Sequence, residues 1–358
     1  MHLQKIRLRN FRNIDLLGLE FHPQCNIFVG PNAQGKTNIL ESIYFLAFGR
    51  SFRLQDYKPL IQWGHTEAFV KASVLQSAGS EEREAHLNPE KKRFSKNGKG
   101  STPNQFKSMP VVLFAPEEIL LLKEAPQARR DYMDGLISKI SPTYEDHLRR
   151  YKRALSQRNK LLKDEFLARE EKEKQIILWE TPMFEEAKHL IKERGLWIQR
   201  LNEILEPQYG AISGDLKKAQ FIYEPNTKTE NYQEYQEKRR ADELERRISL
   251  VGPHRDDFNA DLQSQKIQAS GSQGEMRTFT LALKLSEIEL FERVLGESPI
   301  LLLDDVMSEL DKNRNEHLFK VLQNFKGQVF ATATSIDLFP TGVLKEYSSW
   351  ELKDGKIV

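Results

Sequence analysis

The sequence is poor in cysteine and lacks any long apolar run. Cys25 is the only cysteine among 358 residues, so an internal disulfide is impossible, which fits a reducing compartment. Its place at the start of an apolar run predicts a small structural residue. No stretch approaches the about 20 apolar residues that a membrane-spanning helix needs. Residues 1–9 alternate polar and apolar side chains, which predicts a strand and not a signal peptide. We therefore expect a cytoplasmic protein with no membrane partner.

The sequence also lacks an excess of charge of one sign. The 54 Lys and Arg residues nearly balance the 52 Asp and Glu residues, and the net charge is +2. This balance neither demands nor excludes a nucleic-acid partner, so any basic surface must be local. With 39% hydrophobic and 30% charged residues, the chain is globular with a highly charged surface. Its length leaves room for two domains or lobes.

The most informative stretch lies near the N-terminus. Ile27 to Val29 predict a short buried strand, and residues 38–46 predict a helix with apolar positions at near-helical spacing. Between them lies a loop of the form G-x-x-x-x-G-K-T, which consists of Gly30, Pro31, Asn32, Ala33, Gln34, Gly35, Lys36 and Thr37. Strand, loop and helix are the context of a phosphate-binding loop, whose backbone N–H groups point at the phosphates.

Two side chains of this loop have separate predicted tasks. Lys36 would reach the β and γ phosphates of a nucleotide, and Thr37 would place its hydroxyl on Mg²⁺. The alternative is a glycine-containing turn that matches the motif by chance. The fit of both flanking segments favours the phosphate-binding loop.

A second strand carries the acids that such a site needs. The apolar run Ile300 to Leu303 predicts a buried strand, and Asp304 and Asp305 follow it directly. Asp304 would hold Mg²⁺ through water, and Asp305 would polarise a water for attack on the γ phosphate. Two acids after an apolar run could instead cap a helix. The phosphate-binding loop upstream favours the nucleotide site.

A short loop narrows the class of ATPase. Residues 271–275, Gly-Ser-Gln-Gly-Glu, resemble the signature loop of ABC ATPases and precede a helix expected from about Arg277 to Val294. Ser272 and the N–H of Gly274 would form an anion site at the start of that helix. Ser308 to Asp311 match the D-loop that follows the acidic strand in that class. Alone, such a turn would be read as a helix cap, but the order of the motifs favours an ABC ATPase.

The rest of the chain divides by composition. The first third predicts strands, among them residues 16–21, 68–75, 84–87, 91–95 and 111–115, with a hairpin turn at Asn97-Gly98. Residues 125–208 predict long amphipathic helices, interrupted near Thr181-Pro182. A charged loop and an exposed helix are expected over residues 226–243. The final third returns to sheet, with a strand over residues 327–334 and a small hairpin around Asp354-Gly355.

Taken in order, these motifs resemble the RecF family of recombination-mediator ATPases. The similar segments cover nearly the whole chain: Asn10–Asn13, Gly30–Thr37, Gly49–Arg53, Phe114–Glu117, Arg129–Arg130, Arg158–Asn159, Gly252–Asp257, Ser272–Gly274 and Leu301–Asp311. The segment Gly-Pro-His-Arg-Asp-Asp at 252–257 best distinguishes this family from ABC transporters, because transporters lack it.

The resemblance implies an α/β fold, that of an ABC-type P-loop ATPase with an SMC-like head. This fold would consist of mixed sheet layers and a helical second lobe. Lobe I would comprise residues 1–115 and 296–358, and lobe II residues 116–295 with the signature loop. The implied activity is a weak, DNA-stimulated ATPase that uses ATP and Mg²⁺. The implied partners are single-stranded or gapped DNA, RecO and RecR in loading RecA, and a second copy of the chain in an ATP-dependent dimer. Replication-fork repair and the SOS response would be its setting.

The resemblance also implies roles for matched positions. Arg12 and Asn13 would touch phosphate, and Ser272 would sense the γ phosphate across the dimer. Lys36 and Thr37 would be phosphate and magnesium ligands, Asp304 the magnesium acid and Asp305 the catalytic carboxylate.

Several positions depart from the family pattern. Glu275 and Met276 stand where glutamines are usual, so a negative charge lies near a phosphate pocket. Glu118 stands where Asp is commoner. Thr332-Ala333-Thr334 offers no counterpart of the transporter histidine switch, and Gln62 is only a weak candidate for the Q-loop glutamine.

Two other functions compete with that of a DNA-binding ATPase. A structural SMC-type head would need hundreds of heptad residues between the nucleotide motifs, whereas Lys36 and Asp304 lie only 268 positions apart. An ABC transporter subunit would lack the segment His254 to Asp257. Candidate DNA contacts are two basic clusters, although such a cluster is more often just a solvated face: Lys91, Lys92, Arg93, Lys96 and Lys99, and Arg149, Arg150, Lys152, Arg153 and Arg158.

Overall fold

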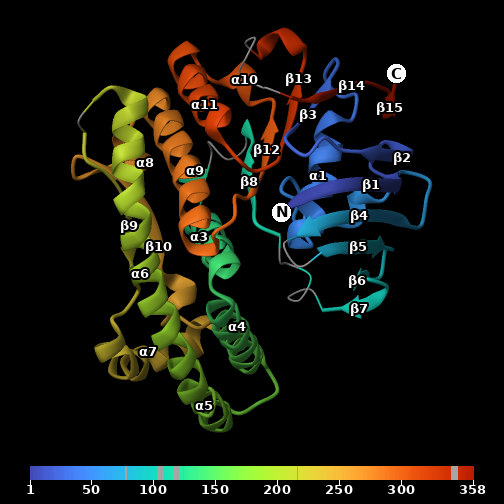
Figure 1. Cartoon of the computed structure of the whole chain (residues 1–358). Coiled ribbons are helices and arrows are strands. Elements are labelled where there is room, and N and C mark those ends of the chain that lie inside the picture. Colours follow the sequence, from blue (N-terminus) through green and yellow to red (C-terminus); the bar gives the residue numbers. More distant parts are fainter. Residues whose placement is uncertain are drawn as a thin grey trace. The chain divides into compact units, whose positions relative to one another are not determined.

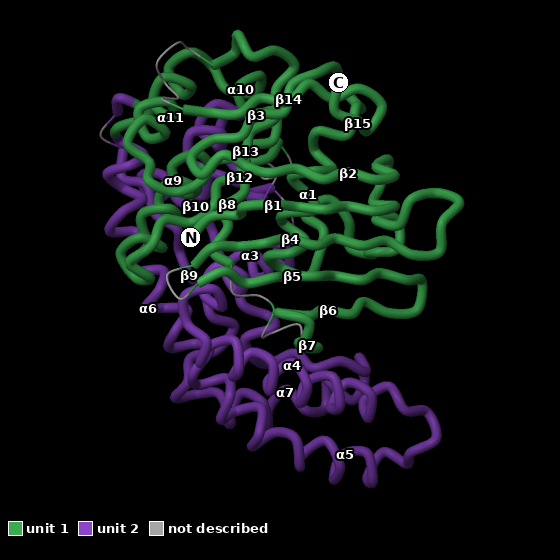
Figure 2. Tube along the Cα trace, turned by 45° about the vertical axis from the view of Figure 1, so that its right-hand side comes forward, with its two compact units in different colours: residues 1–119, 211–213, 280–358 green, residues 120–210, 214–279 purple. Residues whose placement is uncertain are grey.

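The computed structural model describes residues 1–76, 79–102, 106, 109–116, 121–123, 125–215, 217–339 and 346–358. The chain forms two compact units, which are coloured separately in Figure 2. Unit 1 comprises residues 1–119, 211–213 and 280–358, and unit 2 comprises residues 120–210 and 214–279. The expected lobe boundaries at 115/116 and 295/296 remain a prediction.

The first sheet of unit 1 is antiparallel and has the strand order β2-β1-β4-β5-β6-β7 (Figure 1). Its strands are β1 (His2–Phe11), β2 (Ile14–Glu20), β4 (Ala68–Gln76), β5 (Gly79–Leu87), β6 (Lys92–Lys96) and β7 (Lys99–Ser101). Asn97 and Gly98, both at positive φ, make the tight turn between β6 and β7. Buried and less buried side chains alternate along β4, as expected of a sheet with one face in the core.

The second sheet of unit 1 is mostly parallel, with the order β15-β14-β3-β13-β12-β8. Its strands are β3 (Cys25–Val29), β8 (Val111–Phe114), β12 (Ile300–Asp304), β13 (Val329–Ala333), β14 (Ser348–Lys353) and β15 (Lys356–Ile357). Every residue of β12 and β13 is buried, as in a sheet covered on both faces. Because β3 and β12 run parallel, on either side of β13, the phosphate-binding loop and the two acids leave the same edge of the sheet.

Helix α1 (Lys36–Phe48) lies between the two sheets. It packs against β12 and β13 on one side and against β1, β4 and β5 on the other (Figure 1). Its predicted apolar positions Ile39, Leu40, Ile43 and Leu46 are all fully buried. A single hydrophobic core therefore contains side chains from both sheets and from α1. The remaining described helices of unit 1 are η1 (Lys58–Leu60), α10 (Val306–Glu309), α11 (Lys312–Asn324) and η5 (Ile336–Leu338).

Unit 2 is mainly helical and contains a three-stranded sheet of order β11-β10-β9. Its strands are β9 (Ala219–Glu224), β10 (Asp257–Leu262) and β11 (Gln265–Lys266). Its helices are α3 (Pro126–Ile140), α4 (Pro142–Lys163), α5 (Arg169–Ile177), α6 (Glu180–Ser213), η3 (Thr229–Asn231), α7 (Tyr232–Arg246), η4 (Pro253–Arg255) and α8 (Ile267–Ser270). The last residues of α6 belong to unit 1, and α9 (Gln273–Leu295) begins in unit 2 and continues in unit 1.

A buried polar network holds the Gly-Pro-His-Arg-Asp-Asp segment in unit 2. Arg194, which is 1% exposed, donates to Asp134, to Asp256 and to the carbonyl of Pro253. The two carboxylates surround the guanidinium, and their charge holds the pKa of Arg194 above its usual value despite burial. Gly252 has φ 127°, and a Cβ there would lie 2.4 Å from the hydroxyl of Tyr151, so only glycine fits. The segment is thus a packed structural element.

Most expected elements are confirmed, with two differences. α9 begins at Gln273, before the expected Arg277, because Ser272 and Glu275 form a capping box. β9 was not predicted. Glu117 and Glu118 lie outside the described residues. Within the described part of the chain, no helix has the length and apolar character needed to cross a membrane.

Candidate nucleotide-binding site

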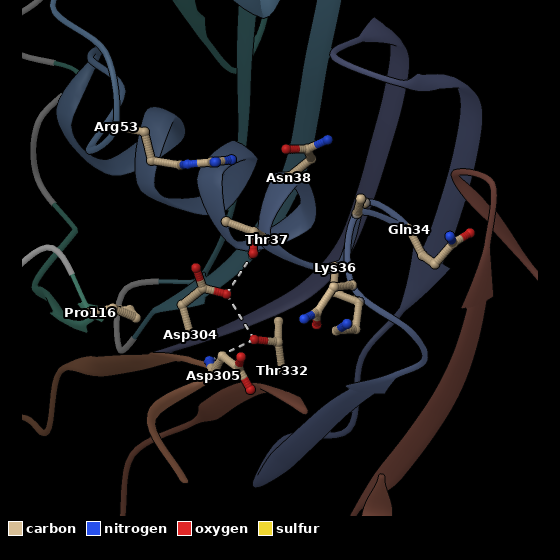
Figure 3. Close-up of a pocket in the computed structure, with 12 residues that line it drawn as sticks. Gln34, Lys36, Thr37, Asn38, Arg53, Pro116, Asp304, Asp305 and Thr332 are labelled. Atoms are coloured by element: carbon tan, nitrogen blue, oxygen red, sulfur yellow. Dashed lines mark hydrogen bonds between the residues drawn. The ribbon is translucent and has the colours of Figure 1, made fainter. Parts of the chain in front are cut away.

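A cavity of about 480 Å³ opens where the phosphate-binding loop meets the ends of β12 and β13 in unit 1 (Figure 3). Asp304, Asp305 and Thr332 approach it from the two strands. Its lining residues are Asn32, Ala33, Gln34, Gly35, Lys36, Thr37, Asn38, Arg53, Pro116, Asp304, Asp305 and Thr332. The structure therefore brings together most of the loop and both predicted acids.

Glycine at the two ends of the loop lets the backbone adopt its turn. Gly30 has φ 144°, and a Cβ there would lie 2.5 Å from the carbonyl oxygen of Leu352. Gly35 has φ 101°, and a Cβ there would lie 2.8 Å from Oδ1 of Asn13. Gly35 also precedes α1 as its N-cap and provides no side-chain hydrogen bond to the first turn. The start of α1 is therefore suited to bind an anion through backbone N–H groups.

The side chain of Lys36 is held inside the phosphate-binding loop. Its Nζ donates to the carbonyls of Gly30 and Pro31, both at 2.7 Å, and the residue is 6% exposed. Burial lowers the pKa of Lys36, while the nearby carboxylates of Asp305 and Asp304 oppose that shift. The loop thus holds an oriented cation. Phosphate oxygens could replace the two carbonyls as its hydrogen-bond acceptors.

Asp304 connects the loop to β13. Its Oδ1 accepts hydrogen bonds from the hydroxyls of Thr37 and Thr332, each at 2.8 Å. The Thr332 hydroxyl in turn accepts the backbone N–H of Asp305 at 2.9 Å. A continuous chain of hydrogen bonds thus runs from α1 to Asp305, as the dashed lines of Figure 3 show.

Asp305 has a strained backbone and an unsatisfied carboxylate oxygen. Its φ of 50° and ψ of 27° lie in the left-handed region, which is uncommon for a residue other than glycine. Its Oδ1 is buried and has no hydrogen-bond partner. An orphaned acceptor at the cavity wall fits a bound water or a hydrated cation.

The donor set at the cavity fits Mg²⁺. A hydroxyl at Thr37 and a carboxylate at Asp304 are the hard oxygen ligands that Mg²⁺ prefers. Among the described residues, no group of three or more His, Cys, Asp and Glu side chains could hold a metal ion. In nucleotide sites Mg²⁺ generally takes most of its ligands from phosphates and water.

Arg12 and Asn13 lie beside the loop but do not line the cavity. The guanidinium of Arg12 donates twice to the fully buried carboxylate of Glu41, at 2.7 Å each. Asn13 contacts Gly35 and accepts a hydrogen bond from Asn38 at 2.7 Å. In this structure Arg12 thus fixes the β1–β2 turn onto α1, and its contact with phosphate remains a prediction. Gln62 is likewise bonded to Asp15, away from the cavity lining.

Four lining residues had no role assigned from sequence: Asn38, Arg53, Pro116 and Thr332. Arg53 and Pro116 lie in segments that the family resemblance had marked, so a signal for them existed. For Thr332, the sequence indicated only that the switch histidine of transporters has no counterpart in this segment. Its hydroxyl between two acids could be found only from the register of β12 against β13, which pairs Asp304 with Thr332.

The signature loop, residues 271–275, lies in unit 2. Ser272 Oγ and N both donate to the Glu275 carboxylate at 2.9 Å, and the N–H of Glu275 returns a bond to Ser272 Oγ. Lys217 pairs with the same carboxylate at 3.1 Å. The pKa of Glu275 is lowered, mainly by the backbone hydrogen bond from Ser272 and next by the bond from Lys217. Ser272 is exposed, and Gly274 lies in the first turn of α9.

The fold and the site of unit 1 define a class: an ABC-type P-loop ATPase with an SMC-like head. The model of the RecF/RecN/SMC N-terminal domain matches residues 2–106. The chain is 35% identical to the DNA replication and repair protein RecF of Oceanobacillus iheyensis, with 100% of both chains covered. It is 36% identical to that of Halalkalibacterium halodurans, with 100% of this chain and 99% of the relative covered. The chain belongs to the RecF family.

Solved structures agree with this assignment. The recombination mediator protein RecF of the RecFOR pathway, solved with ATP, is 32% identical, with a TM-score of 0.88 over 100% of this chain and 97% of that one. The same protein solved with ATPrS gives the same TM-score over 99% and 97%. An Smc head domain of Pyrococcus furiosus is 16% identical, with a TM-score of 0.60 over 100% of this chain and 96% of that one, and shares the fold alone. The expected fold class, mixed sheet layers with a helical second part, is confirmed.

Proposed function

We propose that this protein is an ATP-dependent DNA-binding ATPase of recombinational repair and replication. One observation carries the proposal: the hydrogen-bonded chain from Thr37 through Asp304 and Thr332 to Asp305, beside the buried ammonium of Lys36. The names of the full-length relatives and the ATP-bound family structures support it. The same family membership favours it over a transporter subunit or a structural SMC head.

The residues of the cavity divide the chemistry among them. Loop N–H groups and Lys36 would bind and orient the β and γ phosphates. Thr37 and Asp304 would hold Mg²⁺, which supplies positive charge to the phosphates when bound. Asp305 would orient and polarise the attacking water through its unsatisfied Oδ1. Arg53, on the cavity wall, would add a second cation.

The signature loop would act across a pair of chains. In the proposed head-to-tail dimer, Ser272 and the N–H of Gly274 from one chain would bind the γ phosphate held by Lys36 of the other. ATP would thereby join the two chains, and hydrolysis would release them. The Glu275 carboxylate now bonded to Ser272 would oppose an incoming phosphate, so ATP-driven pairing should be weak and reversible.

DNA and protein partners follow from the family. The proposed ligand is single-stranded or gapped DNA, and the proposed partners are RecO and RecR in loading RecA, within the SOS response and in the cytoplasm. Hydrolysis would be slow and stimulated by DNA. Of the basic candidates, Arg158 is excluded as a DNA contact because it is fully buried against Glu180, Glu243 and Ser249. The exposed candidates without a described carboxylate partner are Lys91, Arg93, Lys99 and Arg153.

Retention on immobilised gapped DNA tests this proposal. Wild-type protein should be retained with ATP and largely lost with ADP, because only the triphosphate would support the dimer. Asp305→Asn should be retained for longer with ATP, since it keeps the site but hydrolyses slowly. Retention that is indifferent to nucleotide would contradict an ATP-dependent DNA-binding function.

A further inference from the structure

The side chain of Thr332 forms hydrogen bonds to both acids of the site. It lies in β13 opposite Asp304 of β12 and is 2% exposed. Its hydroxyl donates to Asp304 Oδ1 and accepts the backbone N–H of Asp305 (Figure 3). The side chain of one acid and the backbone of the other are therefore tied to one oxygen atom.

The donor and acceptor capacity of a hydroxyl fixes the direction of each bond. Thr332 has one proton, and it goes to the carboxylate, because an ionised carboxylate accepts only. A lone pair of Oγ1 then takes the N–H of Asp305. Asp304 Oδ1 also receives the proton of Thr37, so two threonine hydroxyls hold one oxygen from different sides. The proton of Thr37 thus points at Asp304, which leaves its lone pairs for a cation.

The second bond restrains a residue that would otherwise relax. The backbone of Asp305 is left-handed, a conformation that is less favourable for aspartate than for glycine. The bond from its N–H to Thr332 restrains it at the strand end, together with the hydrogen bonds that its carbonyl accepts from Ser308, and Oδ1 stays buried and without a partner. Loss of the hydroxyl would leave that N–H unpaired and let the carboxylate turn away.

We propose that Thr332 is a positioning residue that sets the Asp304 carboxylate for Mg²⁺ and the Asp305 carboxylate for the attacking water. This rests on the proposed ATPase function and adds a residue to it. Thr332 acts through the two acids and need not touch the nucleotide. A valine, which matches its shape but not its hydroxyl, should uncouple both acids while leaving the phosphate-binding loop intact.

Four proteins test the proposal: wild type, Thr332→Val, Thr332→Ser and the matched control Thr334→Val, an exposed threonine directly after the same strand. The readouts are kcat and the Mg²⁺ concentration that gives half-maximal ATP binding in calorimetry. Thr332→Val should lower kcat at least about tenfold, the scale of a lost hydrogen bond to a charged group. It should raise the Mg²⁺ requirement several-fold and leave ATP binding in EDTA unchanged. Thr332→Ser and Thr334→Val should behave like wild type.

The outcomes separate clearly. Wild-type values of kcat and Mg²⁺ requirement in Thr332→Val overturn the proposal. So does equal impairment of Thr332→Ser, because then the shape of threonine and not its hydroxyl matters. If Thr332→Val does not fold, the Thr332→Ala and Thr332→Ser pair gives the same comparison. A wild-type protein that does not bind ATP would instead refute the proposed function.

Discussion

At the residue scale, Lys36 is a buried ammonium that depends on two loop carbonyls for its hydrogen bonds. Water would solvate an exposed lysine, whereas this one is oriented before any phosphate arrives. Pre-orientation matters because a ligand then meets the cation without the cost of ordering a long side chain. The lowered pKa of Lys36 shows what burial costs, and the facing carboxylates of Asp304 and Asp305 limit the shift.

We expect Lys36→Ala to weaken ATP binding by more than tenfold, that is, by about 1.4 kcal/mol or more. The phosphates would lose the cation that the loop holds among them. Isothermal calorimetry measures the affinity directly. Lys71→Ala is a suitable control, since it removes a partly exposed lysine that pairs with Glu82. Equal ATP affinity in the two variants would refute the assignment of the phosphate-binding loop.

Single residues of the site differ in how far the sequence could predict them. Lys36, Thr37 and Asp304 follow from local motifs, because strand, loop and helix fix their directions. The position of Arg12 could not be predicted, because its partner Glu41 lies a turn into α1 and the two meet only when β1 and α1 pack. Ion pairs between distant segments leave no local pattern.

At the element scale, the segment at 252–257 is built for packing within unit 2. His254 accepts from the hydroxyl of Tyr151 through Nδ1 and donates to the carbonyl of Ser249 through Nε2. A neutral ring satisfies both contacts. Burial, helped by the charges of Arg255, Arg130 and Arg158, lowers the pKa of His254 to about 4 from its ordinary value of 6.5.

This pKa predicts a dependence of stability on pH. Since the unfolded histidine binds a proton more readily than the folded one, unfolding free energy should fall as pH drops from about 6.5 to about 4. The loss between pH 7 and pH 5 should be about 1–2 kcal/mol. Urea unfolding of wild type and His254→Gln at both pH values measures it. His254→Gln should show the smaller loss, and equal losses would mean that another group titrates. Asp256 acts in the opposite direction, because burial raises its pKa.

Elements were predictable where their periodicity was long and were missed where it was short. The repeats of α1 and of the helices in residues 125–208 are several turns long, so their existence was clear. β9 has only six residues and follows a helix, so it carries too little pattern to stand out. The early start of α9 could have been predicted, because Ser-x-x-Glu at 272–275 is itself a helix-start signal.

At the scale of the whole molecule, the proposed switch is a pair of chains. We expect a dimer with ATP, and mainly monomer with ADP or in Ser272→Arg with ATP, because arginine would displace the γ phosphate contact. Analytical ultracentrifugation gives the mass in each case. Ser270→Arg, in the short helix just before the loop, is a control for added charge. A Ser272→Arg protein that still pairs with ATP would show that the switch is built differently.

The enclosure of α1 restricts how this protein can change over time. Ten of its side chains are buried, and the helix has a sheet on each side. An inserted residue would turn everything after it by about 100° about the helix axis. An ordinary amphipathic helix could hide such a turn on its solvent face, but α1 has little such face. Lineages should therefore gain and lose residues in loops and keep the length of α1 fixed.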